Sequence, residues 1–368
     1  MKDMRPITGA FDVRRVEKPI SDAARPSARS AGKGMDMSTS FVRKSFSRRQ
    51  LLGMGAFAAV AGLGLTACSG EAPAPAGSES AAAGSSEGSA KTNTDIDVKA
   101  YDKLLASGTV AAEDVVAAST WASKVKQAGK LRVGGVETST LFSLKNPDDG
   151  KVRGFDAGLS QLLARYITGK EANTELLQVT SDTRESVLQN DQVDSVFGTY
   201  SITDERKKVV AFAGPYYTTQ QSILVLVDNK DIDGVDDLNG KTVAVQSGST
   251  GPDIVKELAP DATQQEFKTD EEARGALDDG RVDAYVIDTN MQLGSMVKNP
   301  GKYRLAGDPF GPEDSYGIGL PLDSDAKPFV NDFLKQVEEA GLWEELWKVC
   351  IGDRAGIDDV PNPPAIEA

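Results

Sequence analysis

The 368-residue sequence contains no histidine and only two cysteines, Cys68 and Cys350. Without imidazole, the chain cannot build a Ser-His-Asp hydrolase, a Cys-His protease or a His-ligated zinc or iron site. Two cysteines so far apart are also too few for a four-thiolate metal site or a disulfide framework. These absences exclude every mechanism that depends on imidazole or on clustered thiolates.

Basic residues are outnumbered, with 41 Lys and Arg against 55 Asp and Glu and a formal charge of −14. This balance argues against nucleic acid as a partner, because Lys and Arg supply most of the affinity for phosphate. The apolar runs are short, and none reaches the ~18 uncharged apolar residues of a membrane-spanning helix. The length of the chain predicts two or three structural units.

Paired arginines precede a short apolar segment in the first part of the chain. The sequence SRRQLL at 47–52 leads into a Gly/Ala-rich run at 54–65, and LTAC follows at 65–68. The arginine pair resembles a twin-arginine export signal, and LTAC resembles a bacterial lipobox. We therefore expect residues 1–67 to be removed and Cys68 to be lipidated. The alternative is a buried amphipathic helix with an incidental cysteine.

The segment that follows Cys68 is poor in apolar side chains. Residues 71–97 read EAPAPAGSESAAAGSSEGSAKTNTDID, which cannot bury enough surface to fold. We expect residues 68–97 to form a lipidated, disordered tether on the extracellular face of the cell membrane. Residues 1–67 hold 12 Lys and Arg and 5 Asp and Glu, so their removal changes the charge to −21. A pocket for an acidic ligand must then supply its own cations.

From residue 130 onward, strand-like and helix-like segments alternate. The first set comprises strands at 131–134, 176–179 and 195–198 with helices at 156–168, capped by Asp156, and 184–189. The second set comprises strands at 222–227, 243–245 and 284–287 with helices at 252–258 and 270–278. This alternation predicts βαβ units and a mostly parallel sheet in each of two lobes.

Two segments rich in Tyr, Gly and Pro, 214–221 and 308–317, are placed to connect the lobes. Helices that begin at Pro328 and Leu342 then follow. If the chain returns to the first lobe there, the cleft between the lobes is the expected site. The predicted organisation is a helical lead-in at 98–129, lobe 1 at 130–217 plus 316–352, lobe 2 at 222–307 and a C-terminal tail at 353–368.

The turn at 246–252 is the first candidate for ligand binding. It joins a strand to a helix, and the free N–H groups of the helix start favour an anion there. The hydroxyls of Ser249 and Thr250 would add donors. The alternative is ordinary N-capping of the helix.

A second candidate is the segment 200–208. Arg206 follows a helix cap at Thr203, so its guanidinium could bind a carboxylate bidentately beside the Ser201 hydroxyl. The alternative is a solvated charged helix. Arg184, at the start of its own helix, offers a second cation or a surface salt bridge with Asp182 or Glu185.

Asp288 ends the strand at 284–287 and can either cap the next helix or bind an ammonium group. Together with the arginines and hydroxyls, it describes a receptor for an amino acid. No nucleophile–base pair is evident.

Residues 154–352 resemble extracellular solute-binding proteins of the polar amino-acid family, which serve ABC importers. The matching motifs are GFD at 154–156, VD at 193–194, ITDERKK at 202–208, FAGPYY at 212–217, DLNGK at 237–241, QSGST at 246–250 and GRVDA at 280–284. The resemblance implies a periplasmic-binding-protein-like α/β fold. Its two lobes, joined by two hinge strands, close on the ligand.

The resemblance also implies roles for individual residues. Arg206 would bind the ligand α-carboxylate, assisted by Ser201, Ser249 and Thr250. Asp288 and the backbone carbonyl of Thr199 would hold the α-ammonium. The sequence VTSDTR at 179–184 is similar to the glutamate-binding branch, in which Arg184 would face a side-chain carboxylate. An aromatic residue that the family often places near the first strand has no evident counterpart in 137–142, where Glu137 and Phe142 lie.

The sequence therefore predicts a lipid-anchored, monomeric receptor that binds glutamate and docks on a membrane permease, without metal, cofactor or catalysis. The alternatives are a dehydratase-like enzyme on the same scaffold, a ligand-sensing domain, and a receptor for glutamine, aspartate or cystine. Cys350, near Trp347, is expected to be a small buried apolar residue.

Overall fold

The computed structural model describes residues 95–367. The export signal expected at 1–67, the lipidation expected at Cys68 and the expected tether up to residue 94 all concern residues outside this range. No helix within 95–367 has the length and apolar content that crossing a bilayer requires.

The described helices are α1 (Val98–Ser107), α2 (Glu113–Ala117), α3 (Thr120–Ala128), α4 (Phe155–Thr168), α5 (Arg184–Gln189), η1 (Arg206–Lys208), η2 (Val235–Leu238), α6 (Gly251–Leu258), α7 (Asp270–Asp278), α8 (Thr289–Lys298), α9 (Ala326–Glu339), α10 (Leu342–Trp347), η3 (Lys348–Gly352) and α11 (Asp353–Ala355). The strands are β1 (Leu131–Gly135), β2 (Thr138–Ser139), β3 (Ser143–Lys145), β4 (Val152–Arg153), β5 (Thr174–Gln178), β6 (Ser195–Val196), β7 (Ala211–Leu226), β8 (Thr242–Gln246), β9 (Thr263–Phe267), β10 (Ala284–Asp288), β11 (Tyr303–Leu305) and β12 (Phe310–Leu320).

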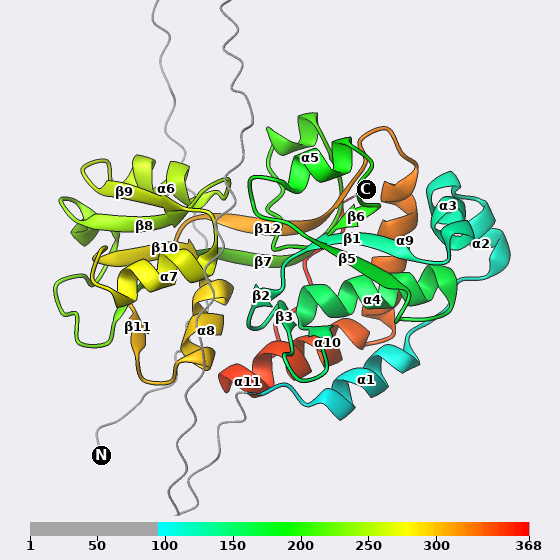
Figure 1. Ribbon diagram of the computed structural model, residues 1–368, viewed down its shortest axis with the longest axis horizontal. Coiled ribbons are helices and arrows are strands. Elements are labelled where there is room, and N and C mark those ends of the chain that lie inside the picture. Colours follow the sequence, from blue (N-terminus) through cyan, green and yellow to red (C-terminus); the bar gives the residue numbers. More distant parts are fainter. Residues whose placement is uncertain (1–94, 368) are drawn as a thin grey trace, which may run out of the picture. The chain divides into compact units, whose positions relative to one another are not determined.

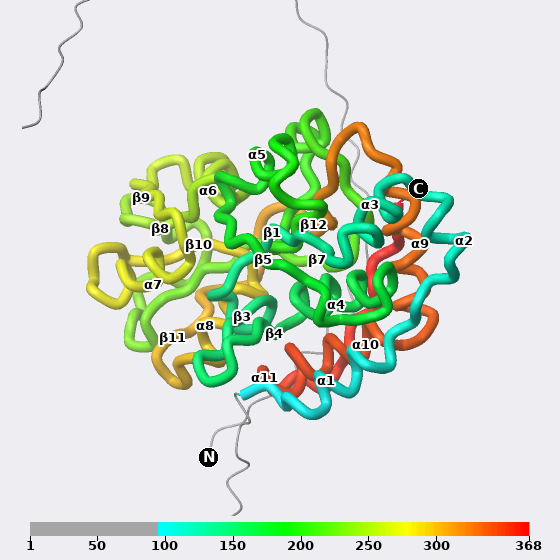
Figure 2. Tube along the Cα trace, turned by 45° about the vertical axis from the view of Figure 1, so that its right-hand side comes forward, coloured from blue at the N-terminus to red at the C-terminus, as the bar shows by residue number. Residues whose placement is uncertain are grey.

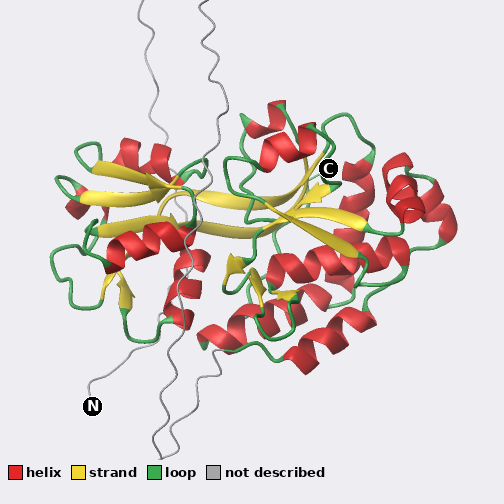
Figure 3. Cartoon of the chain, in the orientation of Figure 1, coloured by secondary structure: helices red, strands yellow, loops and turns green. Residues whose placement is uncertain are grey.

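A nine-stranded sheet runs through both lobes in the order β5-β1-β6-β12-β7-β10-β8-β9, with β11 also paired to β7 (Figure 1). In lobe 1, β1 pairs in parallel with β5 and β6, and in lobe 2, β8 pairs in parallel with β9 and β10. Helices cover the sheet in each lobe (Figure 3). The predicted α/β class with two lobes is confirmed.

Two long strands carry the chain between the lobes. β7 runs from lobe 1 into lobe 2 without interruption, and β12 returns beside it in antiparallel pairing, with Thr218 opposite Ser315 and Tyr217 opposite Tyr316. The predicted crossings at 214–221 and 308–317 fall on these two strands. The segment 222–227 was predicted as a separate strand, and its residues 222–226 form the far end of β7.

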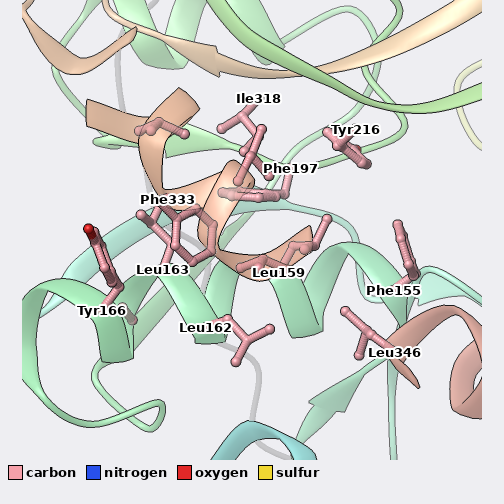
Figure 4. Packing of buried hydrophobic residues seen from close by; sticks show 14 of the residues in the cluster. Phe155, Leu159, Leu162, Leu163, Tyr166, Phe197, Tyr216, Ile318, Phe333 and Leu346 are labelled. Carbon is pink, nitrogen blue, oxygen red and sulfur yellow. The ribbon is translucent and has the colours of Figure 1, made fainter. Parts of the chain in front are cut away.

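The core of lobe 1 forms around α4, whose apolar residues recur at helical spacing. Leu159, Leu162, Leu163 and Tyr166 are all buried, and the Tyr166 ring centroid lies 5.5 Å from that of Phe333 in α9 (Figure 4). These side chains hold α4 against the sheet and against α9.

The prediction that Asp156 caps α4 is wrong. The N-cap residue is Gly154, and no side chain bonds to that cap. Asp156 is fully buried and accepts hydrogen bonds from the Thr199 N–H and the Tyr216 hydroxyl, both at 2.8 Å. It therefore ties α4 to the loop after β6 and to strand β7.

Lobe 2 has a core on each face of its sheet, because successive residues of a strand point to opposite faces. Val243 and Val245 of β8 pack with Val255 of α6 on one face. Ala244 between them packs with Leu277 of α7 on the other face. The two helices therefore cover opposite sides of the same strands.

The lead-in helices belong to lobe 1. Tyr101 of α1 and Trp121 of α3 are buried in its core, and α1 lies alongside α10 (Figure 2). Trp121 donates its indole N–H to the Asp194 carbonyl, and Asp325 accepts from the N–H of Trp121. Ile96, assigned by sequence to the tether, packs against this core.

The C-terminal segment also packs on lobe 1. The Arg354 guanidinium donates to the Thr140 carbonyl at 2.6 Å, and the Glu367 N–H donates to the Gly214 carbonyl at 2.9 Å. Cys350 is fully buried, with no exposed surface. Helix α9 begins two residues before the predicted start at Pro328.

Candidate ligand-binding site

The structure brings the seven candidate residues together between the lobes. Lobe 1 contributes Arg184 from α5, Arg206 from η1, and Thr199 and Ser201 from the loop after β6; lobe 2 contributes Ser249, Thr250 and Asp288. A cavity of about 20 Å³ lies between the lobes and is lined by Ser181, Arg184, Thr199, Ser201, Gln246, Ser249, Ile287, Asp288 and Met291. Arg206 and Thr250 lie next to this cavity but do not line it. Residues of both lobes therefore line the same small cavity, and most of them are polar.

Arg206 directs its guanidinium across the cleft. Nη1 donates to the Ser201 carbonyl at 2.8 Å, and Nη2 donates to the Gly248 carbonyl of lobe 2 at 2.7 Å. Its Nε lies 3.5 Å from a carboxylate oxygen of Glu185. Because the side chain is only 12% exposed, the alternative of a solvated charged helix does not describe Arg206, although Lys207 and Lys208 of the same turn are exposed.

Arg184 is buried beside Arg206. Its Nη1 donates to the carbonyls of Gly198 and Thr199, and its Nη2 donates to the same Gly248 carbonyl at 3.3 Å. Burial, and next the charge of Arg206, lowers the pKa of Arg184 to about 10. The alternative of a surface salt bridge is therefore wrong, and two guanidiniums converge on one acceptor position.

Tyr200 supports both guanidiniums, a role that the sequence analysis missed. Its ring centroid lies 4.2 Å from Cζ of Arg184 and 5.3 Å from Cζ of Arg206, within cation–π range. Its hydroxyl donates to Glu185 at 2.6 Å. Only its place between Thr199 and Ser201 in the chain could have pointed to it.

Thr199 has an unusual backbone conformation, with φ of 45°. Left-handed geometry in a β-branched residue is strained and persists where surrounding contacts enforce it. Here the Thr199 N–H donates to buried Asp156 and its carbonyl accepts from Arg184. Burial raises the pKa of Asp156 to about 6. These contacts fix the carbonyl at the edge of the cavity.

The lobe 2 turn places two hydroxyls at the start of α6. The Ser249 hydroxyl donates to the Gln246 carbonyl at 2.7 Å and accepts from the Gly251 N–H. Thr250 occupies the N-cap position without a side-chain cap bond, and its hydroxyl instead donates to Asp314 at 3.1 Å. The capping alternative therefore does not describe Thr250.

Asp288 is buried at the end of β10 and accepts hydrogen bonds from the Gln221 amide and the Tyr316 hydroxyl. It makes no side-chain cap bond to α8, so the capping alternative is wrong. Burial, and next the charge of Asp314, raises the pKa of Asp288 to about 7. Asp314 and Gln221 could not be selected from the sequence, because polar residues in the two crossings resemble those of any connecting segment.

The lobes touch directly at the mouth of the cleft. The Ser247 hydroxyl donates to Asp182 at 2.7 Å, and the Gln246 amide donates to the Ser181 hydroxyl at 3.2 Å. Gly248 lies so close to lobe 1 that a Cβ there would be 2.6 Å from an Asp182 carboxylate oxygen. The turn at 246–250 is thus the principal lobe 2 contact at this end of the cleft.

Two residues left open by the sequence lie outside this cavity. Glu137 pairs with Lys145 at 3.1 Å and lines a separate cavity of about 500 Å³ in lobe 1. Phe142 is buried and packs against Phe155 and Tyr217. Within residues 95–367, no group of three or more acidic or cysteine side chains is placed to hold a metal ion.

Two α/β lobes joined by paired strands, with a charged site between them, define a solute receptor of the binding-protein type. Residues 131–352 match the model of the family described as Bacterial extracellular solute-binding proteins, family 3. The chain belongs to this family. The lead-in helices α1–α3 lie outside the matched residues.

Several relatives named for amino acids are similar in sequence. The chain is 43% identical to the glutamine-binding protein of Geobacillus stearothermophilus over 197 residues. This match covers 53% of this chain and 74% of the relative. The chain is also 30% identical to the glutamate-binding protein GluB of Corynebacterium glutamicum over 246 residues. That match covers 64% of this chain and 83% of the relative.

Solved structures share the fold. An ancestral arginine-binding protein bound to glutamine is 33% identical, with a TM-score of 0.57, over 61% of this chain and 98% of that one. The solute receptor for L-cysteine of Neisseria gonorrhoeae has a TM-score of 0.62 over 65% of this chain and 97% of that one. At 22% identity, the second likeness shows the fold alone.

Proposed function

We propose that this protein binds a free polar amino acid, with glutamate favoured, in the cleft between its lobes and delivers it to an ABC permease. The observation that carries the proposal is the convergence of Arg184 and Arg206 on the Gly248 carbonyl. A ligand carboxylate beside that carbonyl would be paired with ionised donors, and a bidentate pair of guanidinium and carboxylate adds geometric specificity as well as energy. The two guanidiniums therefore mark the side of the site that suits an anionic group.

The two poles of an amino acid match the two sides of the site. Arg206 would bind the α-carboxylate, with Ser201 and the hydroxyls of Ser249 and Thr250 as further donors. Asp288 and the Thr199 carbonyl would hold the α-ammonium. Because these groups come from both lobes, the ligand would favour the arrangement in which the lobes meet.

Arg184 favours glutamate over glutamine. A second guanidinium, buried and close to the first, gains a counter-charge from a side-chain carboxylate but none from an amide. The second candidate ligand is glutamine, which is favoured by the 43% identity to a glutamine-binding protein. With either ligand, the protein would have the same role as the receptor of an ABC importer.

The purified chain without residues 1–67 should be titrated with glutamate, glutamine, aspartate and cystine by calorimetry. We expect one site with the highest affinity for glutamate, and Arg184→Met should remove most of the preference over glutamine. Arg281→Met, which removes a half-exposed arginine outside the cleft, should leave the preference unchanged. Tighter binding of glutamine would identify glutamine as the ligand. Absence of any amino-acid binding would reject the role, and chemical conversion of the ligand would indicate a cleft enzyme instead.

We also propose that Cys68 carries a lipid anchor that holds a monomer at the extracellular face of the membrane. The LTAC sequence at 65–68 and membership of an extracellular family support this. Mass spectrometry of the protein from its native host should find a diacylated N-terminal cysteine. Cys68→Ser should release the protein from membranes, and retention of that variant would contradict the anchor.

A further inference from the structure

Asp314 is a buried carboxylate in the hinge strand β12, and the proposed ligand contacts do not include it. Its side chain is 8% exposed. The Thr250 hydroxyl of lobe 2 donates to it at 3.1 Å, and the Ser201 hydroxyl of lobe 1 stabilises its charged form. Asp314 therefore lies between two residues that the proposed function assigns to the ligand.

A continuous polar network joins Asp314 to Asp288. The Gln221 amide donates to Asp288, and the same nitrogen lies 3.4 Å from the Thr250 hydroxyl that bonds Asp314. The other amide atom, Gln221 Oε1, is buried without a hydrogen-bond partner. The network consequently retains acceptor capacity for a donor such as an ammonium group.

The charges around this pair leave both carboxylates without a cation in contact. The Tyr316 hydroxyl donates to Asp288, whereas Tyr217, Tyr285 and Arg184 interact with it only through longer-range electrostatics. Arg184 and Arg206 act on Asp314 in the same way. Within residues 95–367, neither aspartate forms an ion pair, because both guanidiniums are bonded to backbone carbonyls.

Two buried carboxylates in one network do not both ionise readily, because burial and mutual repulsion each favour a proton on the pair. Burial is the main cause that raises the pKa of Asp288 to about 7, and the charge of Asp314 is the next. Burial also raises the pKa of Asp314.

We propose that Asp314 and Asp288 share one proton on the side of the site that would hold the ligand ammonium group, and that binding of this ammonium group expels the proton to solvent. In this step the O–H bond of the carboxylic acid breaks, a solvent base takes the proton, and N–H donors of the ammonium replace it. No bond to the ligand is made or broken. The proposal rests on the proposed amino-acid-binding function and makes Asp314 a positioning residue that sets the charge of Asp288.

The direction of the pH effect follows. Below pH 7 the pair holds the proton, so binding must release it and affinity should fall as the pH decreases. Well above pH 7 the pair is already ionised, and the release should vanish. With a pKa of about 7, release should be about 0.8 proton per ligand at pH 6.5 and about 0.2 at pH 7.5.

Calorimetric titration with glutamate in PIPES and in imidazole buffers, which differ in ionisation enthalpy, measures the protons released. In Asp314→Asn, release at pH 6.5 should fall below the wild-type value, since burial remains but the repulsion that helps to hold the proton is gone. Asp253→Asn, which removes an exposed carboxylate in the first turn of α6, should behave as the wild type.

Wild-type binding with less than ~0.1 proton released at pH 6.5 would overturn the proposal. The same release in wild type and Asp314→Asn would also overturn it. The wild-type measurement stands whether or not the variant folds. If the wild type gives no binding heat with any amino acid, the proposed function itself fails, which is distinguishable from binding without proton release.

Discussion

Replacement of Gly248 by alanine tests whether ligand binding requires the lobes to meet at the turn 246–250. A Cβ at Gly248 would lie 2.6 Å from an Asp182 carboxylate oxygen, 2.8 Å from the Asp182 backbone nitrogen and 2.9 Å from the Ser181 carbonyl carbon. Two of these three atoms are backbone atoms of the opposite lobe. A side-chain rotation cannot relieve such contacts, so the lobes must separate.

The expected magnitude follows from the cost of overpacking, typically about 1–3 kcal/mol. This cost falls only on the arrangement in which the lobes touch, so affinity should decrease about 5- to 160-fold. Gly248 also has a φ of 70°, which costs an alanine about 1–2 kcal/mol in stability. That second cost is the same whether the lobes are together or apart.

Gly240→Ala is the matched control. Gly240 has a φ of 77° in the same lobe, and a Cβ there would meet no atom within 4 Å. Both variants should lose similar thermal stability, whereas only Gly248→Ala should lose affinity for glutamate in a calorimetric titration. Equal affinity for glutamate in the two variants would refute the reasoning, whether both bind as the wild type does or both bind more weakly.

Three further predictions concern the site and the core. Arg206→Ala should weaken amino-acid binding by about 2–4 kcal/mol, or about 30- to 870-fold, because charge-assisted bonds are lost. Unchanged affinity in calorimetry would reject its role. Trp121→Ala should lower the free energy of unfolding by about 3–5 kcal/mol in urea titration, because the ring is buried against Phe329; a loss below ~1 kcal/mol would show that α3 is not part of the folded unit. Burial raises the pKa of the Cys350 thiol, so in a Cys68→Ser variant this thiol should react with Ellman's reagent only after denaturation; rapid labelling of the native protein would contradict the described core.

The elements with strong periodicity could be predicted closely from the sequence. Helix α5 and helix α7 have the predicted limits, and α4 ends at Thr168 as expected. Local pattern works there because burial against a single neighbouring layer decides the outcome. Only the far end of the continuous strand β7 was predicted as a strand, and 214–221 was predicted as a connection, because Gly214 and Pro215 interrupt the apolar pattern.

Some residues of the candidate site could likewise be selected from the sequence, and others could not. Residues next to motif turns, such as Arg206 and Ser249, could be selected because strand ends and helix starts are visible in the sequence. Asp156 was misread as a helix cap because its partners, Thr199 and Tyr216, are 43 and 60 residues away. Asp314 was missed for a related reason: its importance comes from burial beside Asp288 and Thr250, which no local pattern encodes.

Both ends of the described chain belong to lobe 1, since Ile96 packs into its core and Glu367 bonds to Gly214. Lobe 2 is therefore an insertion, reached only through β7 and β12. Fluorescent reporters attached at the two ends of the described chain would both sit on lobe 1 and would not detect a movement of lobe 2 relative to lobe 1. An optical sensor for the ligand needs its second dye within the inserted half, and the exposed end of α6 at Leu258 offers a place for it.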